Sequence, residues 1–299
     1  MTNYIGELAA LATALCWSIS ALFSTHAGRA VGPLVINRLR LVLSVLFLSL
    51  SHLIVLHTLI PPQATPQRLL WLSLSGFLGL TVGDALLFQA YIWIGPRLGV
   101  LLQCTVPIFS TILAWLFFRE TLTWQQIGGI TLTLSGIVAV IMERSKSKVD
   151  ISPHYMKGIL LALSAAACQS TGLLISKQAM GDDLPALSAT LIRMTAAATI
   201  LWLITLARGE GQATLHELKT HRQATFFIFI MSIIGTFIGI WLSMVAVQHA
   251  KLGIASTLMN LMPIFMMPLS YFFLHEAVSK QAIAGTIIAV MGVAILFMG

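Results

Sequence analysis

Charged side chains are scarce in this sequence. Asp, Glu, Lys and Arg together make up 9% of the 299 residues, hydrophobic residues make up 58%, and the mean hydropathy is +0.92. A soluble domain of this length needs a far more polar surface than these residues can supply. The shortage of charge therefore argues against a water-soluble fold and predicts a protein that lies in a lipid bilayer.

Cysteine is also rare, and no metal motif accompanies it. Cys16, Cys104 and Cys168 lie inside apolar runs, without a CxxC pair or a flanking histidine cluster. This pattern argues against a disulfide framework and against a zinc site, so we interpret the thiols as packing residues. A P-loop is missing too, which argues against ATP-driven transport by this chain alone. We expect no cofactor and no metal.

Motifs of intramembrane enzymes and of nucleic-acid binding are lacking as well. At 275–280, Ser279 stands where a zincin needs its second histidine, and the stretch of Val82, Gly83 and Asp84 does not complete a Gly-x-Gly-Asp motif. The net charge of +7 comes from cations between apolar runs rather than from one basic face. An intramembrane enzyme is therefore disfavoured, and no nucleic-acid partner is expected.

Long apolar runs dominate what is present. A helix needs about 20 mostly apolar residues to cross about 30 Å of hydrocarbon, and a β-barrel would need alternating polarity that these runs do not show. We predict an all-α integral membrane protein with ten transmembrane helices, the first of them retained rather than cleaved. The expected spans are 7–27, 34–57, 69–94, 98–118, 125–142, 158–179, 185–206, 224–247, 252–274 and 281–298.

The sequence repeats its own plan. A shift of 156 positions brings nine pairs into register without a gap, and smaller offsets pair Cys16 with Cys168 and Arg40 with Arg193. We therefore predict a first five-helix unit at 1–145, a connecting loop at 146–156 and a second unit at 157–299. Because five is odd, the second unit enters the membrane from the opposite side. Such inverted repeats are typical of transporters that bind their solute near the midplane. The nine pairs are Gly79/Gly235, Gly83/Gly239, Ala90/Ala246, Pro107/Pro263, Phe109/Phe265, Glu120/Glu276, Gln125/Gln281, Gly129/Gly285 and Gly136/Gly292.

One motif within the repeat resembles a known family. It consists of a Pro, a Glu 13 residues later, a Gln after five more, and two glycines four and eleven residues beyond the Gln. The doubled motif resembles the drug/metabolite transporter superfamily, in particular its EamA-type ten-helix members, over the whole chain. The resemblance implies a carrier of small organic solutes such as amino acids, sugars, nucleotide-related compounds or drugs.

The repeated residues also have structural interpretations. Small-residue stripes in the fifth and tenth spans should let helices approach closely. Glu120 and Glu276 are expected to cap the helices that follow them. Pro107 and Pro263 are either hinges for rocking or static kinks. The stripes are Gly129, Thr133, Gly136 and Gly285, Ala289, Gly292.

Asp84 is an acidic residue inside the third span. An ionised carboxylate at membrane depth must be paired, protonated or hydrated. It is either a coupling or substrate-binding group, with a proton exchanged for solute, or one partner of a salt bridge to Arg40 or Arg97. The second half has Ile240 at the equivalent position.

Further polar residues are candidates for a central cavity. Arg40 and Arg193 could each bind a solute carboxylate or could snorkel to the interface, and snorkelling is favoured. We predict that the cavity is lined by Trp17, Asn37, Arg40, Asp84, Gln103, Gln169, Arg193, Trp241 and Asn260.

Together these features predict a secondary-active exporter of amino acids or similar metabolites that works by alternating access. Coupling of export to protons is one possibility. A passive facilitator or channel and an importer remain alternatives. The expected partners are a small solute, protons and lipid, in an inner membrane, as a monomer or homodimer. Basic residues favour termini outside the cell, whereas the resemblance favours termini in the cytoplasm.

Overall fold

The computed structural model describes residues 4–58, 63–143, 154–265, 268–269 and 280–298, and these residues contain helices and no strand. The first half forms α1 (Ile5–Val31), α2 (Pro33–Leu56), α3 (Pro66–Gly76), the π-helix η1 (Phe77–Gly83), α4 (Asp84–Gln103), α5 (Val106–Phe118) and α6 (Trp124–Glu143). The second half forms α7 (Tyr155–Met180), α8 (Ala186–Ala207), α9 (Gly211–Thr220), α10 (Arg222–Met231), η2 (Ser232–Gly239), α11 (Ile240–His249), α12 (Leu252–Met259) and α14 (Lys280–Met298).

The helices have the length and polarity of membrane spans. In the described residues, five helical stretches of 22 to 28 residues are apolar enough to cross a bilayer, and four shorter apolar helices accompany them. The lipid-facing surface is visible on α2, where Leu46, Leu50 and Ile54 follow one another at helical spacing and are each more than half exposed. Such a stripe is stable in lipid but not in water. The predicted all-α membrane fold is confirmed.

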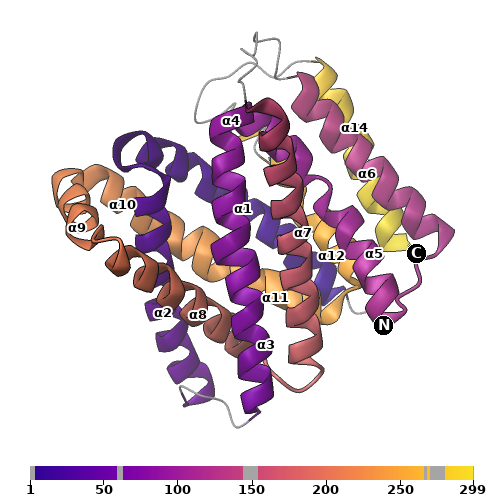
Figure 1. Cartoon of the computed structure of the whole chain (residues 1–299). Helices are drawn as coiled ribbons and strands as arrows, with labels where there is room; N and C mark the ends of the chain where they lie inside the picture. Colours follow the sequence, from indigo (N-terminus) through magenta and orange to yellow (C-terminus); the bar gives the residue numbers. More distant parts are fainter. Residues whose placement is uncertain (1–3, 59–62, 144–153, 266–267, 270–279, 299) are drawn as a thin grey trace.

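The two halves exchange their first helices. Helix α1 packs against α10, η2, α11 and α12, all from the second half, whereas α7 packs against α3, η1, α4 and α5, all from the first. In Figure 1, α7 accordingly runs beside the magenta and purple helices of the first half. Each half therefore completes the other, as expected of an inverted repeat.

The third helix of each half contains a π-helical segment at the equivalent place. Glycines in these segments bring the exchanged helices close together. A Cβ at Gly83 would lie 3.5 Å from Cβ of Cys168, and a Cβ at Gly239 would lie 3.3 Å from Cβ of Cys16. Because Cys16 and Cys168 are themselves a repeated pair, the same crossing is built twice. No signal in the sequence predicted the π-helices.

The two small-residue stripes pack on each other. A Cβ at Gly136 would lie 2.5 Å from the carbonyl oxygen of Gly285, and one at Gly129 would lie 3.0 Å from that of Gly292. Helices α6 and α14 lie side by side at one edge of the molecule in Figure 1. The predicted role of these glycines in close helix packing is confirmed.

Helix α9 was not among the predicted spans. It is a short polar segment between α8 and α10, at the left edge of Figure 1. The buried guanidinium of Arg38 on α2 donates to the hydroxyl of Thr214 at 2.8 Å and forms an ion pair with Glu210. These bonds fix the loop that connects α8 and α9 to the first half.

Candidate functional site

The third and second helices of the first half meet at an ion pair. Nη2 of Arg40 donates to Oδ2 of Asp84 at 2.5 Å, and Nε of the same arginine donates to the side-chain oxygen of Asn37 at 2.7 Å. The side chains of Arg40 and Asp84 are only 17% and 15% exposed. Of the two salt bridges considered from the sequence, the structure forms the one to Arg40.

Asp84 occupies a special position along its helix. It is the first residue of α4 and directly follows the π-helix η1. Such bulges widen the helix locally and are frequent at functional sites. Ile240 follows η2 in the same way, so the second half repeats the backbone but not the carboxylate.

Arg193 lies on α8 and is 3% exposed. Its Nη1 approaches the sulfur of Met244 at 2.6 Å, and its buried Nε has no hydrogen-bond partner. In the described part of the chain, no acidic side chain forms an ion pair with it. The favoured expectation that Arg193 snorkels to the interface is wrong, because its guanidinium is enclosed by protein.

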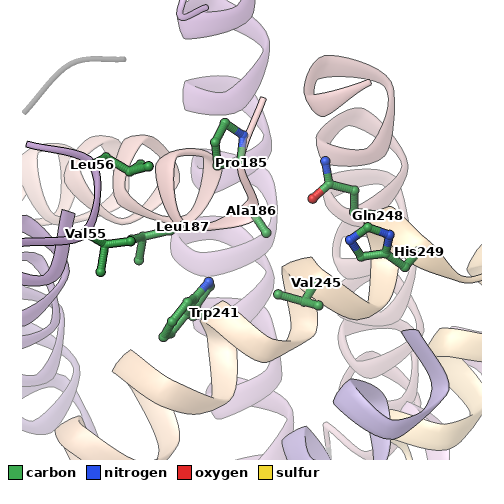
Figure 2. Close-up of a pocket in the computed structure, with 9 residues that line it drawn as sticks. All are labelled: Val55, Leu56, Pro185, Ala186, Leu187, Trp241, Val245, Gln248 and His249. Atoms are coloured by element: carbon green, nitrogen blue, oxygen red, sulfur yellow. The ribbon is translucent and has the colours of Figure 1, made fainter. Parts of the chain in front are cut away.

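A cavity of about 310 Å³ lies between α2, α8 and α11. Figure 2 shows Trp241 pointing from α11 toward Leu187, with Gln248 and His249 further along the same helix. Nε2 of Gln248 donates a hydrogen bond to the carbonyl oxygen of Leu184 at 3.1 Å. Among the residues predicted to line the solute path, Trp241 is therefore placed on a cavity wall. The lining residues are Val55, Leu56, Pro185, Ala186, Leu187, Trp241, Val245, Gln248 and His249.

Four other predicted cavity residues are spread over the two halves. Trp17 packs against Gly239, and Gln169 is half-buried on α7. Nε2 of Gln103 donates weakly to the carbonyl oxygen of Ala162 at 3.4 Å, whereas Nδ2 of Asn260 donates within its own helix. These four are not joined to the cluster of Asn37, Arg40 and Asp84 by any described hydrogen bond.

The fourth predicted span of each half is broken rather than kinked, and in the first half its start is continuous with α4, so the gap expected between 94 and 98 is absent. Helix α4 ends at Gln103 and α5 begins at Val106, so Pro107 lies in a first turn, where a missing N–H costs little. In the second half, α12 ends at Met259 and helical structure resumes at 262, which gives Pro263 the same position. The continuous spans expected at 98–118 and 252–274 are therefore wrong at these points.

A repeated serine binds the backbone at each break. Oγ of Ser170 on α7 lies 3.1 Å from the carbonyl oxygen of Val106, and Oγ of Ser18 on α1 lies 3.0 Å from that of Met262. Each hydroxyl shares its one hydrogen between this acceptor and a carbonyl oxygen one turn earlier in its own helix, at 2.8 Å for Ser170 and 2.7 Å for Ser18. Each serine reaches the broken helix of the opposite half. The breaks are thus held at the contact between the two halves.

Glu120 binds the second half rather than the helix that follows it. Its Oε2 accepts from the backbone N–H of Leu252, the first residue of α12, at 3.0 Å, and its Oε1 lies 2.6 Å from Nζ of Lys177. The expectation that Glu120 caps α6 is wrong in its partner, because Thr123 and Gln126 cap that helix reciprocally. Glu276 lies outside the described residues.

Two polar contacts between distant parts of the chain were not predicted from the sequence. His52 on α2 is fully buried, and its Nε2 lies 2.8 Å from the hydroxyl of Ser188 on α8. Arg68 and Asp183 form a bidentate pair on the same side of the molecule as the Glu120 contacts. Their partners are far apart in the sequence, so only the packing of the halves reveals them.

Comparisons with known proteins agree with this architecture. The EamA-like transporter family matches the chain twice, at 4–142 and at 156–298. The uncharacterized transporter YyaM of Bacillus subtilis (strain 168) is 22% identical over 219 residues, which are 73% of this chain and 70% of that protein. A solved crystal structure, described only as that of a protein, has 17% identity and a TM-score of 0.81, and the match covers 99% of this chain and 98% of that one.

Proposed function

The chain belongs to the EamA-like transporter family and is a multi-pass membrane transporter, and we propose that it exports amino acids or similar small metabolites by alternating access. The observation that carries this proposal is the pair of broken helices at equivalent positions in the two halves. Discontinuous helices near the midplane supply the polar groups of solute sites in inverted-repeat transporters. The proposed repeats are residues 1–145 and 157–299, connected by 146–156.

The serines at the breaks give rocking a structural basis. Ser18 and Ser170 connect each first helix to the broken helix of the other half. A rotation of one half against the other would therefore move the contacts at both breaks at the same time. On this basis Pro107 and Pro263 act as hinges, because each helix is already interrupted beside them.

Three polar contacts between the two halves lie on one side of the protein, where a gate would need them. Glu120 joins Lys177, Arg68 joins Asp183, and Lys251 donates to the carbonyl oxygen of Thr121 at 2.8 Å. All three contacts link the first half to the second on the side of the termini. We assign them to the gate on that side, which must open for solute to pass.

Proton coupling is proposed at Asp84. When its carboxylate is ionised it holds Arg40, and protonation would remove that charge and release the guanidinium. The second half has no carboxylate at the equivalent position, so a single proton would bind, in the first half only. The polar path is proposed to include Trp17, Asn37, Gln103, Gln169, Trp241 and Asn260 as well.

An efflux screen tests the proposal. Cells that overproduce the protein are loaded with amino acids, toxic analogues and common metabolites, and efflux and growth tolerance are measured beside Asp84→Asn. Export of one class that fails in the variant, with normal membrane insertion, supports coupled export. A Glu217→Gln variant on the exposed α9 should match the wild type.

Other outcomes favour the alternatives. Flux that runs down its gradient and ignores an imposed proton gradient would favour a facilitator or channel, and accumulation inside the cell would favour an importer. If no solute moves in either direction, the transport proposal fails.

The proposed location is a bacterial-style inner membrane, with the protein as a monomer or homodimer. Basic residues are more numerous on the loops opposite the termini, so we propose that the termini lie outside the cell. A fluorescent protein fused to the C-terminus should then stay dark. A bright fusion inside cells would reverse the orientation.

A further inference from the structure

The two repeated arginines have different surroundings. Arg40 has a carboxylate partner in Asp84 and an amide partner in Asn37. At the equivalent positions the second half has Ile240 and Thr190, and the hydroxyl of Thr190 donates to the carbonyl oxygen of Ala186. The carboxylate and the amide that bind the first arginine are therefore missing at the equivalent positions around Arg193.

The guanidinium of Arg193 is buried without compensation. It carries five N–H donors, yet among the described residues its one polar contact is the thioether of Met244, a weak acceptor, and its Nε is buried without a partner. A buried cation that lacks a counter-charge is strongly disfavoured. The described side chains supply no counter-charge to this guanidinium.

The π-helix η1 lies directly beside the arginine. Gly79 on η1 faces Nη2, since a Cβ there would lie 3.5 Å from that atom and would meet no other atom of a neighbouring element within 4 Å. Met244, which contacts Nη1, lies on the turn of α11 that presents Trp241 and Val245 to the cavity. The arginine thus contacts the helix that forms one wall of the cavity and also lies beside the π-helix.

We propose that Arg193 binds the carboxylate of the transported solute. This inference rests on the proposed transport function and narrows its substrate class to organic carboxylates, including zwitterionic amino acids. A planar guanidinium matches a carboxylate with two parallel hydrogen bonds, which an amine or an amide cannot accept in the same way. Organic cations are excluded because they would add a second positive charge.

Binding of acetate, the simplest probe with a methyl group, tests the subsite without any transport step. Melting temperature of the purified protein is followed in sodium acetate and in sodium chloride at equal ionic strength. The wild type should show a saturable stabilisation by acetate beyond that by chloride, and Arg193→Gln should lose it. Arg208→Gln, at the exposed end of the same helix, is the matched control and should respond as the wild type does.

A second variant keeps the test decisive if Arg193→Gln does not fold. Arg193→Lys keeps the positive charge but loses the two parallel N–H donors of the guanidinium, so the affinity of this variant for acetate should fall by about tenfold. Equal stabilisation of the wild type by chloride and acetate would overturn the inference, because an inorganic anion would then satisfy the arginine. An unchanged response in Arg193→Lys would overturn it too.

Efflux of matched compounds separates failure of the inference from failure of transport. Leucine, leucinamide and isoamylamine share one side chain and differ in the carboxylate, and alanine and benzoate with their amides extend the set. Export of acids alone, lost in Arg193→Gln, supports the inference. Export of amides or amines at the same rate overturns the substrate class but leaves transport intact, and no export of any solute in the wider screen overturns both.

Discussion

The ion pair between Arg40 and Asp84 allows a quantitative prediction. Replacing Asp84 with Asn leaves a guanidinium without its charge partner, and replacing Arg40 with Gln leaves an unpaired carboxylate. Breaking a buried pair costs about 3–5 kcal/mol. Both side chains keep some exposure, 17% and 15%, and in the Asp84 variant Asn37 still accepts from Nε of Arg40. We therefore expect about 3 kcal/mol for each single variant, at the lower end of that range.

The double variant decides whether the pair acts as a unit. With both charges removed, no unpaired ion remains, so the total cost should be about 3 kcal/mol rather than about 6. The coupling between the two sites is then about 3 kcal/mol. The assay is the free energy of unfolding in lipid bicelles, titrated with a denaturing detergent. Additive costs within about 0.5 kcal/mol would show that the two side chains do not depend on each other, and the reasoning would be refuted.

Three further predictions follow from single contacts. Gly129→Leu should prevent a monodisperse preparation, because its Cβ already meets α14, whereas Gly128→Leu should not, since nothing lies within 4 Å of that position. Equal behaviour of the two variants would contradict the close packing. Ser18→Ala and Ser170→Ala should each cost about 0.6 kcal/mol in unfolding titrations, as expected for interhelical bonds. A large difference between them would contradict the equivalence of the two breaks. The hydrogen bond from its arginine partner on α3 lowers the pKa of Asp183 below the usual 3.8. The contribution of this pair is therefore present above pH 3.8 and is lost as the pH falls through the lower, folded-state pKa. A titration by NMR that places this pKa above 3.8 would contradict the bond.

Much of the fold could be predicted because it depends on patterns along the chain. Apolar run length sets the number of spans, and the shift of 156 positions sets their division into halves. The π-helices could not be predicted, because they arise where η1 and η2 cross α7 and α1. The helix breaks were misjudged for a related reason. A proline signals an interruption, but packing decides whether the helix bends through it or ends before it.

The site divides in the same way. The pair of Arg40 with Asp84 was one of two salt bridges that the sequence offered, and packing selected it. The enclosure of Arg193 was not predictable, since snorkelling depends on how deep α8 lies and on what covers its face. The contact of Lys177 could not be predicted from the sequence, because its partner Glu120 belongs to the other half.

Inverted symmetry alone would make the two arginines equivalent, and neither equivalent arrangement suits a carrier. If both arginines had carboxylate partners, no charge would remain to select a solute. If neither had one, two cations without partners would lie in the membrane core, where each is costly. Asp84 in one half and Ile240 in the other avoid both difficulties. A single carboxylate binds Arg40, and in the proposed role Arg193 stays available for a negative group of the solute.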